Sequence, residues 1–117
     1  MRESIRWSLE NDIETLRDTK TRLDDILECD PEIVTSRHPV TISGSDFQGR
    51  AVMFKYMGAA CSIKEMNKKT SLESLVRYHI YNTERSISNL VSLSRKHAHC
   101  IEQHRIVIDA AGWNLGL

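Results

Sequence analysis

The sequence lacks an excess of charge of either sign, and it lacks long hydrophobic runs. Sixteen Lys and Arg residues balance sixteen Asp and Glu residues, so composition gives no electrostatic reason to expect nucleic acid or an anionic membrane surface as a partner. No apolar stretch approaches the roughly 20 residues that span a bilayer. The N-terminal segment, MRESIRWSLENDIE, is charged throughout and has no apolar core, so it does not resemble a secretory signal.

Cysteine is also scarce, and catalytic motifs are missing. Cys29, Cys61 and Cys100 are odd in number and widely separated, which indicates a reduced intracellular compartment when no secretion signal is present. We expect all three to be buried small apolar residues. There is no G-x-S-x-G, no phosphate loop and no G-x-G-x-x-G. An enzyme is therefore not the favoured class, and no cofactor is predicted.

What is present is typical of a globular domain that opens with helices. Apolar residues make up 40% of the chain and charged residues 27%, and 117 residues correspond to one domain or part of one. Residues 2 to about 18 carry helix formers, with apolar side chains at helical spacing at Ile5, Leu9, Ile13 and Leu16. Asp30 followed by Pro31 predicts the start of a short helix that ends before Pro39.

A β-hairpin is predicted next. The segment 40–42 reads as extended, residues 43–49 as a polar turn with two glycines, and residues 51–57 as a second strand. Successive side chains of a strand point to opposite faces. One face of the second strand is therefore entirely apolar and aromatic, and it consists of Val52, Phe54 and Tyr56.

A long helix and a final strand complete the pattern. Ser62 is expected to cap a two-turn helix, and Thr70 with Glu73 forms a capping box that begins the long one. No Gly or Pro interrupts residues 70–111, which allows about thirty helical residues before a strand that begins at Arg105. The expected apolar stripe is Leu72, Leu75, Val76, Ile80, Ile87, Leu90, Val91, Ala98 and Ile101.

The run Ile106, Val107 and Ile108 is typical of a strand buried on both faces of a parallel sheet. A strand, a long helix and a further strand form a crossover unit, which is right-handed in nearly all proteins. The predicted fold class is therefore α/β, with N-terminal helices, a β-hairpin, a long crossover helix and a final parallel strand.

Two sets of polar residues are of types found in metal or catalytic sites, but neither set makes a complete site. His97, Cys100 and His104 fall on one helical face and are zinc-ligand types, but no fourth ligand is evident and structural zinc motifs usually consist of two tight pairs. We therefore predict no metal site. Asp109 has no partner base to define a reaction, so we expect it to accept hydrogen bonds from the backbone around Gly112.

Glu84 lies on the apolar stripe of the long helix, between Ile80 and Ile87. A carboxylate in that position is costly unless it is paired, hydrogen-bonded or exposed to a cavity. Two interpretations stay open. Either Glu84 faces a ligand pocket, or the stripe ends there and Glu84 reaches solvent or pairs with Arg77 or Arg85.

Several segments together resemble the CRAL-TRIO lipid-binding domain, closest to the phosphatidylinositol/phosphatidylcholine-transfer proteins of the secretory pathway. The family pattern D-x-x-G-R-P-V is matched by Asp46, Gly49, Arg50 and Val52. The pattern E-M-N-K-x-T-S is matched by Glu65, Met66, Asn67, Lys68, Thr70 and Ser71. The family's glutamate on the long helix, its D-x-x-G and its N-terminal tryptophan fall on Glu84, Asp109 with Gly112, and Trp7.

The resemblance implies a protein that binds a phospholipid, of the phosphatidylinositol type, and transfers it between membranes. Acyl chains would lie against an apolar sheet face under a closing helix, with Val52, Phe54 and Tyr56 as the floor and Glu84 among the polar groups of the pocket. The opposite sheet face is the alternative floor, and plain core packing is the alternative role for the three strand residues. The implied location is the cytoplasm, with transient contact with Golgi or endosomal membranes and no nucleic-acid partner.

The resemblance also implies that the chain is an N-terminal slice of a larger domain. Residues 1–37 would close a helical region, and residues 38–117 would form the first part of the lipid-binding domain, with impaired transfer as the consequence. Ala51 replaces the family's proline, and residues 113–116 lack the hydroxyls of choline-lipid binders, which weighs against phosphatidylcholine. A second hypothesis is a protein-interaction or regulatory module that carries no lipid.

Overall fold

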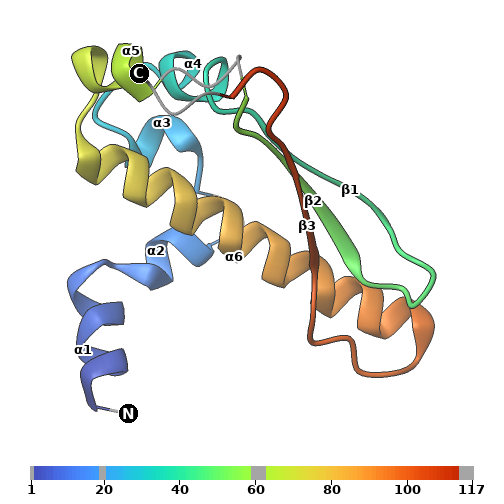
Figure 1. The fold of residues 1–117 in the computed structure, drawn as a ribbon. Helices are drawn as coiled ribbons and strands as arrows, with labels where there is room; N and C mark the ends of the chain where they lie inside the picture. The colour runs from blue at the N-terminus through green and yellow to red at the C-terminus, as the bar shows by residue number, and fades with distance from the viewer. Residues whose placement is uncertain (1, 19–20, 59–62, 114–117) are drawn as a thin grey trace.

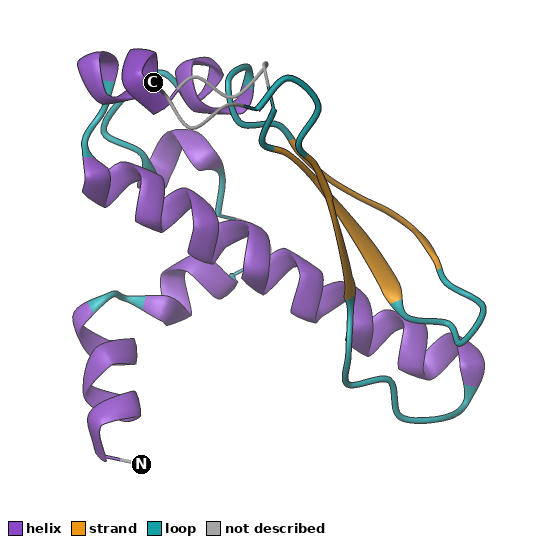
Figure 2. Ribbon diagram, viewed as in Figure 1, coloured by secondary structure: helices purple, strands orange, loops and turns teal. Residues whose placement is uncertain are grey.

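The computed structural model describes residues 2–18, 21–58 and 63–113, which form six helices and three strands (Figures 1 and 2). The elements are α1 (Arg2–Glu10), α2 (Ile13–Arg17), α3 (Leu23–Ile26), α4 (Pro31–Thr35), β1 (Val40–Ser45), β2 (Ala51–Tyr56), α5 (Ile63–Lys69), α6 (Leu72–His97) and β3 (Arg105–Asp109). The predicted mixed α/β class is confirmed, with the long helix connecting two parallel strands.

The N-terminal region is two helices rather than the single one expected. The break falls at Asp12, whose φ of 49° places it in the left-handed region. No side chain within α1 is buried, and Ile5 and Leu9 are exposed, whereas Ile13 and Leu16 of α2 are buried. Only the second half of the predicted stripe therefore reaches the core.

The start of α4 and the presence of the hairpin were predicted correctly, but β1 extends to Ser45, three residues into the expected turn, and β2 ends at Tyr56 rather than Met57. Asp30 caps α4, its carboxylate accepting a hydrogen bond from the Glu32 amide at 3.0 Å, with proline as the first helical residue. Strands β1 and β2 pair antiparallel, with an irregularity in the register between Ile42 and Ser45. Strand β3 pairs parallel to β2, so the order is β1-β2-β3 and β2 is the central strand.

The expectation that Ile106, Val107 and Ile108 are buried on both faces is wrong. Their exposed fractions are 48%, 46% and 56%. The reason is the position of β3 at the edge of the sheet, where it has one neighbouring strand rather than two. A run of β-branched residues is compatible with either position, because burial depends on what surrounds the strand.

Helix α6 differs from its prediction at both ends. Its N-cap is Ser71, whose hydroxyl accepts from the Ser74 amide at 3.1 Å, and not Thr70. Thr70 instead lies with its hydroxyl 3.2 Å from the Cys29 sulfur. The helix has 26 residues rather than about thirty and ends at His97; its C-cap residue, Ala98, has a left-handed φ of 55°.

The predicted stripe of α6 is only partly buried. Ile80 and Leu90 are buried, and so is Ile101, which lies beyond the end of the helix; the exposed members are Leu72, Val76, Ile87, Val91 and Ala98. The helix contacts two separate apolar clusters. One joins it to the N-terminal helices through Ile13, Leu16, Ile26, Leu27, Val34, Tyr78 and Ile80. The other joins it to the sheet through Ala51, Leu90 and Ile101.

Of the cysteines, Cys100 is exposed and Cys29 is partly buried, so the expectation of full burial is wrong for both. Cys61 and the predicted cap Ser62 lie outside the described residues. Among the described helices, none combines the length and the apolar character needed to cross a membrane.

Candidate functional site

The two faces of the central strand have different surroundings. Ala51 and Met53 are 0% and 2% exposed and face α6, which packs against β2. Val52, Phe54 and Tyr56 alternate with them and therefore share the opposite face. The face that α6 covers is closed by core packing, so the alternative acyl floor considered from sequence is occupied by the protein itself.

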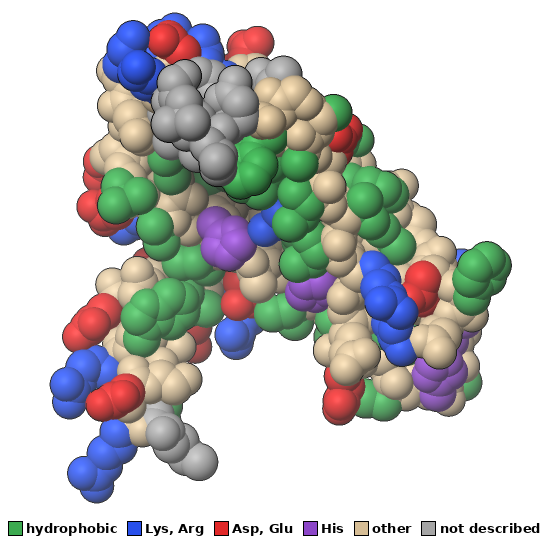
Figure 3. Space-filling view, in the orientation of Figure 1, with side chains coloured by type: hydrophobic (Ala, Val, Ile, Leu, Met, Phe, Trp, Pro, Cys, Tyr) green, Lys and Arg blue, Asp and Glu red, His purple; other side chains and the backbone are tan. Residues whose placement is uncertain are grey.

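The face that carries Phe54 extends onto both neighbouring strands. Register pairs Phe54 with Thr41 of β1 and with Val107 of β3. Tyr56 is 37% exposed and Val107 is 46% exposed, while Val52 and Phe54 are partly buried. Figure 3 shows hydrophobic side chains along the sheet on this side of the molecule. We call the group Val52, Phe54, Tyr56 and Val107 the open sheet face.

Glu84 lies elsewhere. It is 8% exposed, and its Oε2 accepts a hydrogen bond from Arg17 Nε at 3.0 Å, which forms an ion pair between α6 and α2. The helix that carries Glu84 lies on the other side of the sheet from Phe54. The structure therefore groups the three strand residues but does not bring Glu84 to them.

The predicted alternatives for Glu84 also need correction. Its partner is neither of the neighbouring arginines, and it does not reach solvent. Arg77 pairs with Glu73 at 3.5 Å, and Arg85 donates to the backbone carbonyls of Asp18 and Thr21. The residue that sequence reasoning missed is Arg17, which is 67 positions away in the chain.

The turn between β1 and β2 is organised by Asp46. Its Oδ1 accepts from the amides of Gln48 and Arg50 at 2.9 Å, and its Oδ2 accepts from Arg105 Nε at 3.1 Å. Desolvation works to raise the pKa of this carboxyl, but the hydrogen bonds from the Arg50 amide, from Arg105 and from the Gln48 amide outweigh it. The pKa is therefore lowered. Asp46 thus ties the hairpin turn to the first residue of β3.

Gly49 completes the same turn. Its φ is +79°, a conformation that side chains with a Cβ rarely adopt, and a Cβ there would lie 3.2 Å from atoms of His97 and Ile101. The residues that match D-x-x-G-R are therefore accounted for by the geometry of the turn and by its packing on the end of α6.

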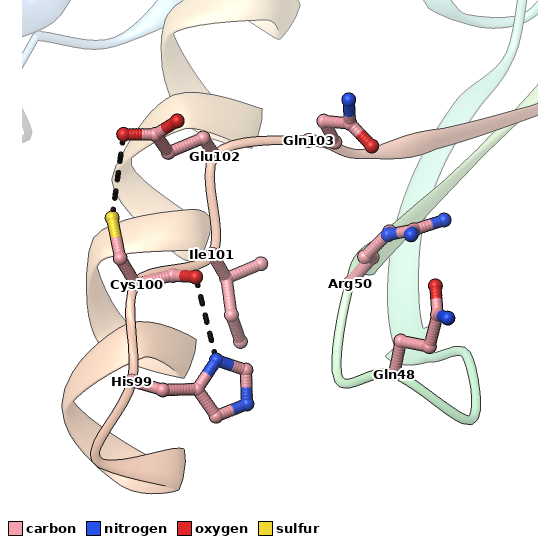
Figure 4. Close-up of a pocket in the computed structure, with 7 residues that line it drawn as sticks. All are labelled: Gln48, Arg50, His99, Cys100, Ile101, Glu102 and Gln103. Atoms are coloured by element: carbon pink, nitrogen blue, oxygen red, sulfur yellow. Dashed lines mark hydrogen bonds between the residues drawn. The ribbon is translucent and has the colours of Figure 1, made fainter.

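A polar pocket of roughly 630 Å³ lies between this turn and the loop that connects α6 to β3 (Figure 4). Its lining residues are Gln48, Arg50, His99, Cys100, Ile101, Glu102 and Gln103. The Cys100 thiol donates to Glu102 Oε1 at 3.4 Å. This hydrogen bond and the negative charge of Glu102 raise the pKa of the thiol. The thiol is thus kept protonated at neutral pH and is a poor nucleophile.

The remaining polar candidates have structural surroundings. Asp109 Oδ1 accepts from the Ala111 amide at 2.9 Å, and Gly112 follows with a φ of +76°, as expected for a turn that the carboxylate stabilises. Within the described residues, no group of three His, Cys, Asp or Glu side chains is arranged to hold a metal ion. His97, Cys100 and His104 do not form such a group.

No protein-family model matches the chain, and no curated protein is similar enough to it to count as a match.

Proposed function

We propose that the chain belongs to a CRAL-TRIO lipid-binding domain that binds a phospholipid of the phosphatidylinositol type and takes part in its transfer. The observation that carries the proposal is the open sheet face. The sheet packs against a helix on one side. On the other side, Val52, Phe54 and Val107 are at least partly accessible and form an apolar surface. Each acyl methylene that leaves water on such a surface contributes about 0.8 kcal/mol.

In this proposal the acyl chains lie along the open sheet face, and Glu84 has a different role. Its ion pair with Arg17 holds α2 against α6, so Glu84 supports the domain and does not contact the acyl chains. The resemblance from sequence adds the setting: a cytoplasmic protein that makes transient contact with Golgi or endosomal membranes. The proposed activity is binding rather than catalysis.

A single sheet face cannot enclose a lipid, so we expect contact with acyl chains but little transfer from this chain alone. The test uses vesicles that contain phosphatidylinositol with a photoactivatable acyl chain. After illumination, the crosslinked peptides are mapped by mass spectrometry. We expect crosslinks within residues 52–56 and 105–109, and vesicle-to-vesicle transfer close to the uncatalysed rate.

Matched variants sharpen this experiment. Phe54→Gln removes the central side chain of the open sheet face and should reduce crosslinking roughly tenfold, as expected from the loss of one large apolar contact. Leu72→Gln makes the same kind of change at an α6 residue that is 75% exposed and should leave crosslinking unchanged. Equal effects of the two variants, or crosslinks confined to the helices, would rule out the open sheet face as the acyl site.

The second candidate, a protein-interaction module without lipid, is supported by a different observation. Strand β3 lies at the edge of the sheet, and all five of its residues are exposed. Exposed strand edges can pair with strands of other chains. Background-level lipid crosslinking in the experiment above would favour this candidate over lipid binding.

A further inference from the structure

The backbone of β3 has a defined open side. The carbonyl oxygen of Asp109 accepts a hydrogen bond from the Met57 amide of β2 at 2.8 Å, within a parallel register that pairs Tyr56 with Asp109. Backbone groups of successive strand residues point alternately to the two sides. Arg105 and Val107 therefore also face β2, while the N–H and C=O groups of Ile106 and Ile108 point to the open edge.

The side chains of β3 are arranged symmetrically about its centre. The strand reads Arg-Ile-Val-Ile-Asp, with a cation at one end, an anion at the other and Val107 in the middle. All five residues are exposed. Such a strand is complementary to itself when reversed, because each charge then meets its opposite.

We propose that a second copy of the chain pairs with this edge, β3 against β3, antiparallel and centred on Val107. This inference does not depend on lipid binding. In the pairing, Arg105 lies opposite Asp109 of the second copy, and Asp109 lies opposite its Arg105. Ile106 and Ile108 face each other across the two-fold axis in the same way.

The alternation of backbone groups fits this register. Ile106 and Ile108 form the hydrogen-bonded pairs, because their backbone groups point outward. The charged pairs and the Val107 pair then occupy non-hydrogen-bonded positions, where opposite Cα atoms approach to about 4.5 Å and side chains are closest. A parallel arrangement would place like charges opposite each other instead.

Arg105 has enough N–H donors to contact both Asp46 of its own chain and Asp109 of the second copy. Its Nε donates to Asp46, and an arginine side chain carries five N–H donors in all. The pairing is isologous, so it closes with two copies. The other sheet edge is β1, where the register is broken between Ile42 and Ser45 and Gly44 has a φ of +71°. Such a bulged edge is poorly suited to further pairing.

The test is the mass of the full chain by sedimentation velocity across the micromolar range. We expect a dimer for the native sequence. Arg105→Glu and Asp109→Arg each place like charges opposite each other and should raise the dissociation constant roughly tenfold or more. An equimolar mixture of the two variants should form dimers again, because every acidic position then meets a basic one. Arg95→Glu has the same charge change on the exposed end of α6 and should leave the dimer unchanged.

Two further variants guard against a loss of folding. Combining Arg105→Glu with Asp109→Arg restores self-complementarity and should restore the dimer wherever the single variants keep native circular dichroism despite their lost contacts with Asp46 and the Ala111 amide. Ile108→Pro removes an outward N–H without removing a bond to β2 and should give a monomer, whereas Ile108→Ala keeps that N–H and should dimerise. A monomeric native chain, dimeric single variants, or a monomeric double swap with native circular dichroism would each overturn the proposal.

Discussion

Arg17 and Glu84 form an ion pair whose two members are unequally solvated. The side chain of Arg17 is 64% exposed and that of Glu84 is 10% exposed. Removing the arginine leaves a nearly buried carboxylate without its counter-ion, whereas removing the carboxylate leaves a guanidinium that water can solvate. We expect Arg17→Ala to lower the free energy of unfolding by roughly 1–3 kcal/mol, and Glu84→Leu to lower it by less.

Urea unfolding of both single variants and of the double variant measures this asymmetry. Once Glu84 is replaced by leucine, the further change Arg17→Ala should cost little, because the buried charge is gone. Equal losses for the two single variants, adding fully in the double variant, would contradict the interpretation of Glu84 as a residue held by Arg17.

Ser86 offers a second test at a single residue. It is 0% exposed, and its hydroxyl has no hydrogen-bond partner among the described residues. A buried hydroxyl without a partner costs free energy, so Ser86→Ala should be neutral or raise the free energy of unfolding by about 1 kcal/mol. Ser74→Ala is the control, since Ser74 is equally buried but its hydroxyl is hydrogen-bonded to Ser71 at 3.2 Å. Thermal unfolding should show a lower midpoint only for Ser74→Ala.

The sequence could place Glu84 on a helix but could not find its partner. Arg77 and Arg85 are its neighbours along the chain, and local spacing is all that a single helix reveals. The true partner belongs to α2 and meets Glu84 only through tertiary packing. For the same reason, the stripe of α6 indicated which residues are apolar but not which of them, such as Ile80 or Ile87, would be covered.

At the level of elements, three basic groups lie close together where the sheet meets α6. They are Lys55 of β2, His79 of α6 and His38, which precedes β1. Lys55 Nζ of β2 lies 3.4 Å from His79 Nδ1 of α6. Desolvation lowers the pKa of His38, and repulsion from Lys55 and His79 lowers it further. Desolvation also lowers the pKa of His79, and repulsion from Lys55 adds to the effect. Both imidazoles are therefore held neutral in the folded chain at pH values where free histidine begins to charge.

This arrangement predicts a loss of stability on mild acidification. The unfolded chain binds protons near pH 6.5, above the pKa values of His38 and His79 in the folded chain. The stability that these two neutral imidazoles contribute is therefore fully present above pH 6.5, and it is lost as the pH falls toward their pKa values in the folded chain. Urea unfolding from about pH 7.5 to about pH 5 should show a decline that His79→Gln reduces. The surface variant His99→Gln is the control, and an unchanged decline in His79→Gln would contradict the prediction.

The hairpin and the crossover were predictable because their signals are local. Alternation defines β2, and the turn residues around Gly49 define the connection before it. The segments that resemble the CRAL-TRIO family also coincide with turns. Asp46 organises the turn between β1 and β2, and Asp109 organises the turn that follows β3. Gly58 adds a close approach, because a Cβ there would overlap the backbone of Ala111. These residues are explained by the path of the chain without any ligand.

For the molecule as a whole, the N-terminal helices contribute unequally to stability. Helix α1 buries no side chain, while α2 buries Ile13 and Leu16 and supplies Arg17 to the ion pair. We expect a chain that begins at residue 11 to keep its free energy of unfolding within about 1 kcal/mol of the full chain. A chain that begins at residue 18 should lose several kcal/mol, since two core side chains are gone.

Urea unfolding of the two shortened chains, followed by far-ultraviolet circular dichroism, makes this comparison. A large loss on removing residues 1–10 would show that α1 has a stabilising contact that its exposed side chains do not reveal. Similar stability for both shortened chains would show that the cluster around Ile13 matters little to the fold.

The environment of β3 was the least predictable feature of the whole molecule. Its composition suits a central strand, yet burial is decided by how many strands and helices surround it. The same limit applies to the open sheet face. The pattern of Val52, Phe54 and Tyr56 defined one face of β2, but only the position of α6 shows that the other face is the covered one.

The parallel pairing of β2 with β3 also determines the order in which the chain can acquire its structure. Tyr56 and Arg105 are separated by the whole of α5 and α6, whereas β1 and β2 are joined by a short turn. A hairpin closes in about 1–10 μs, but a ribosome adds only about 5–20 residues per second. The hairpin of a nascent chain must therefore wait on the order of seconds for its third strand. Throughout synthesis, the most vulnerable edge is that of β2, which is the best-protected strand once the sheet is complete.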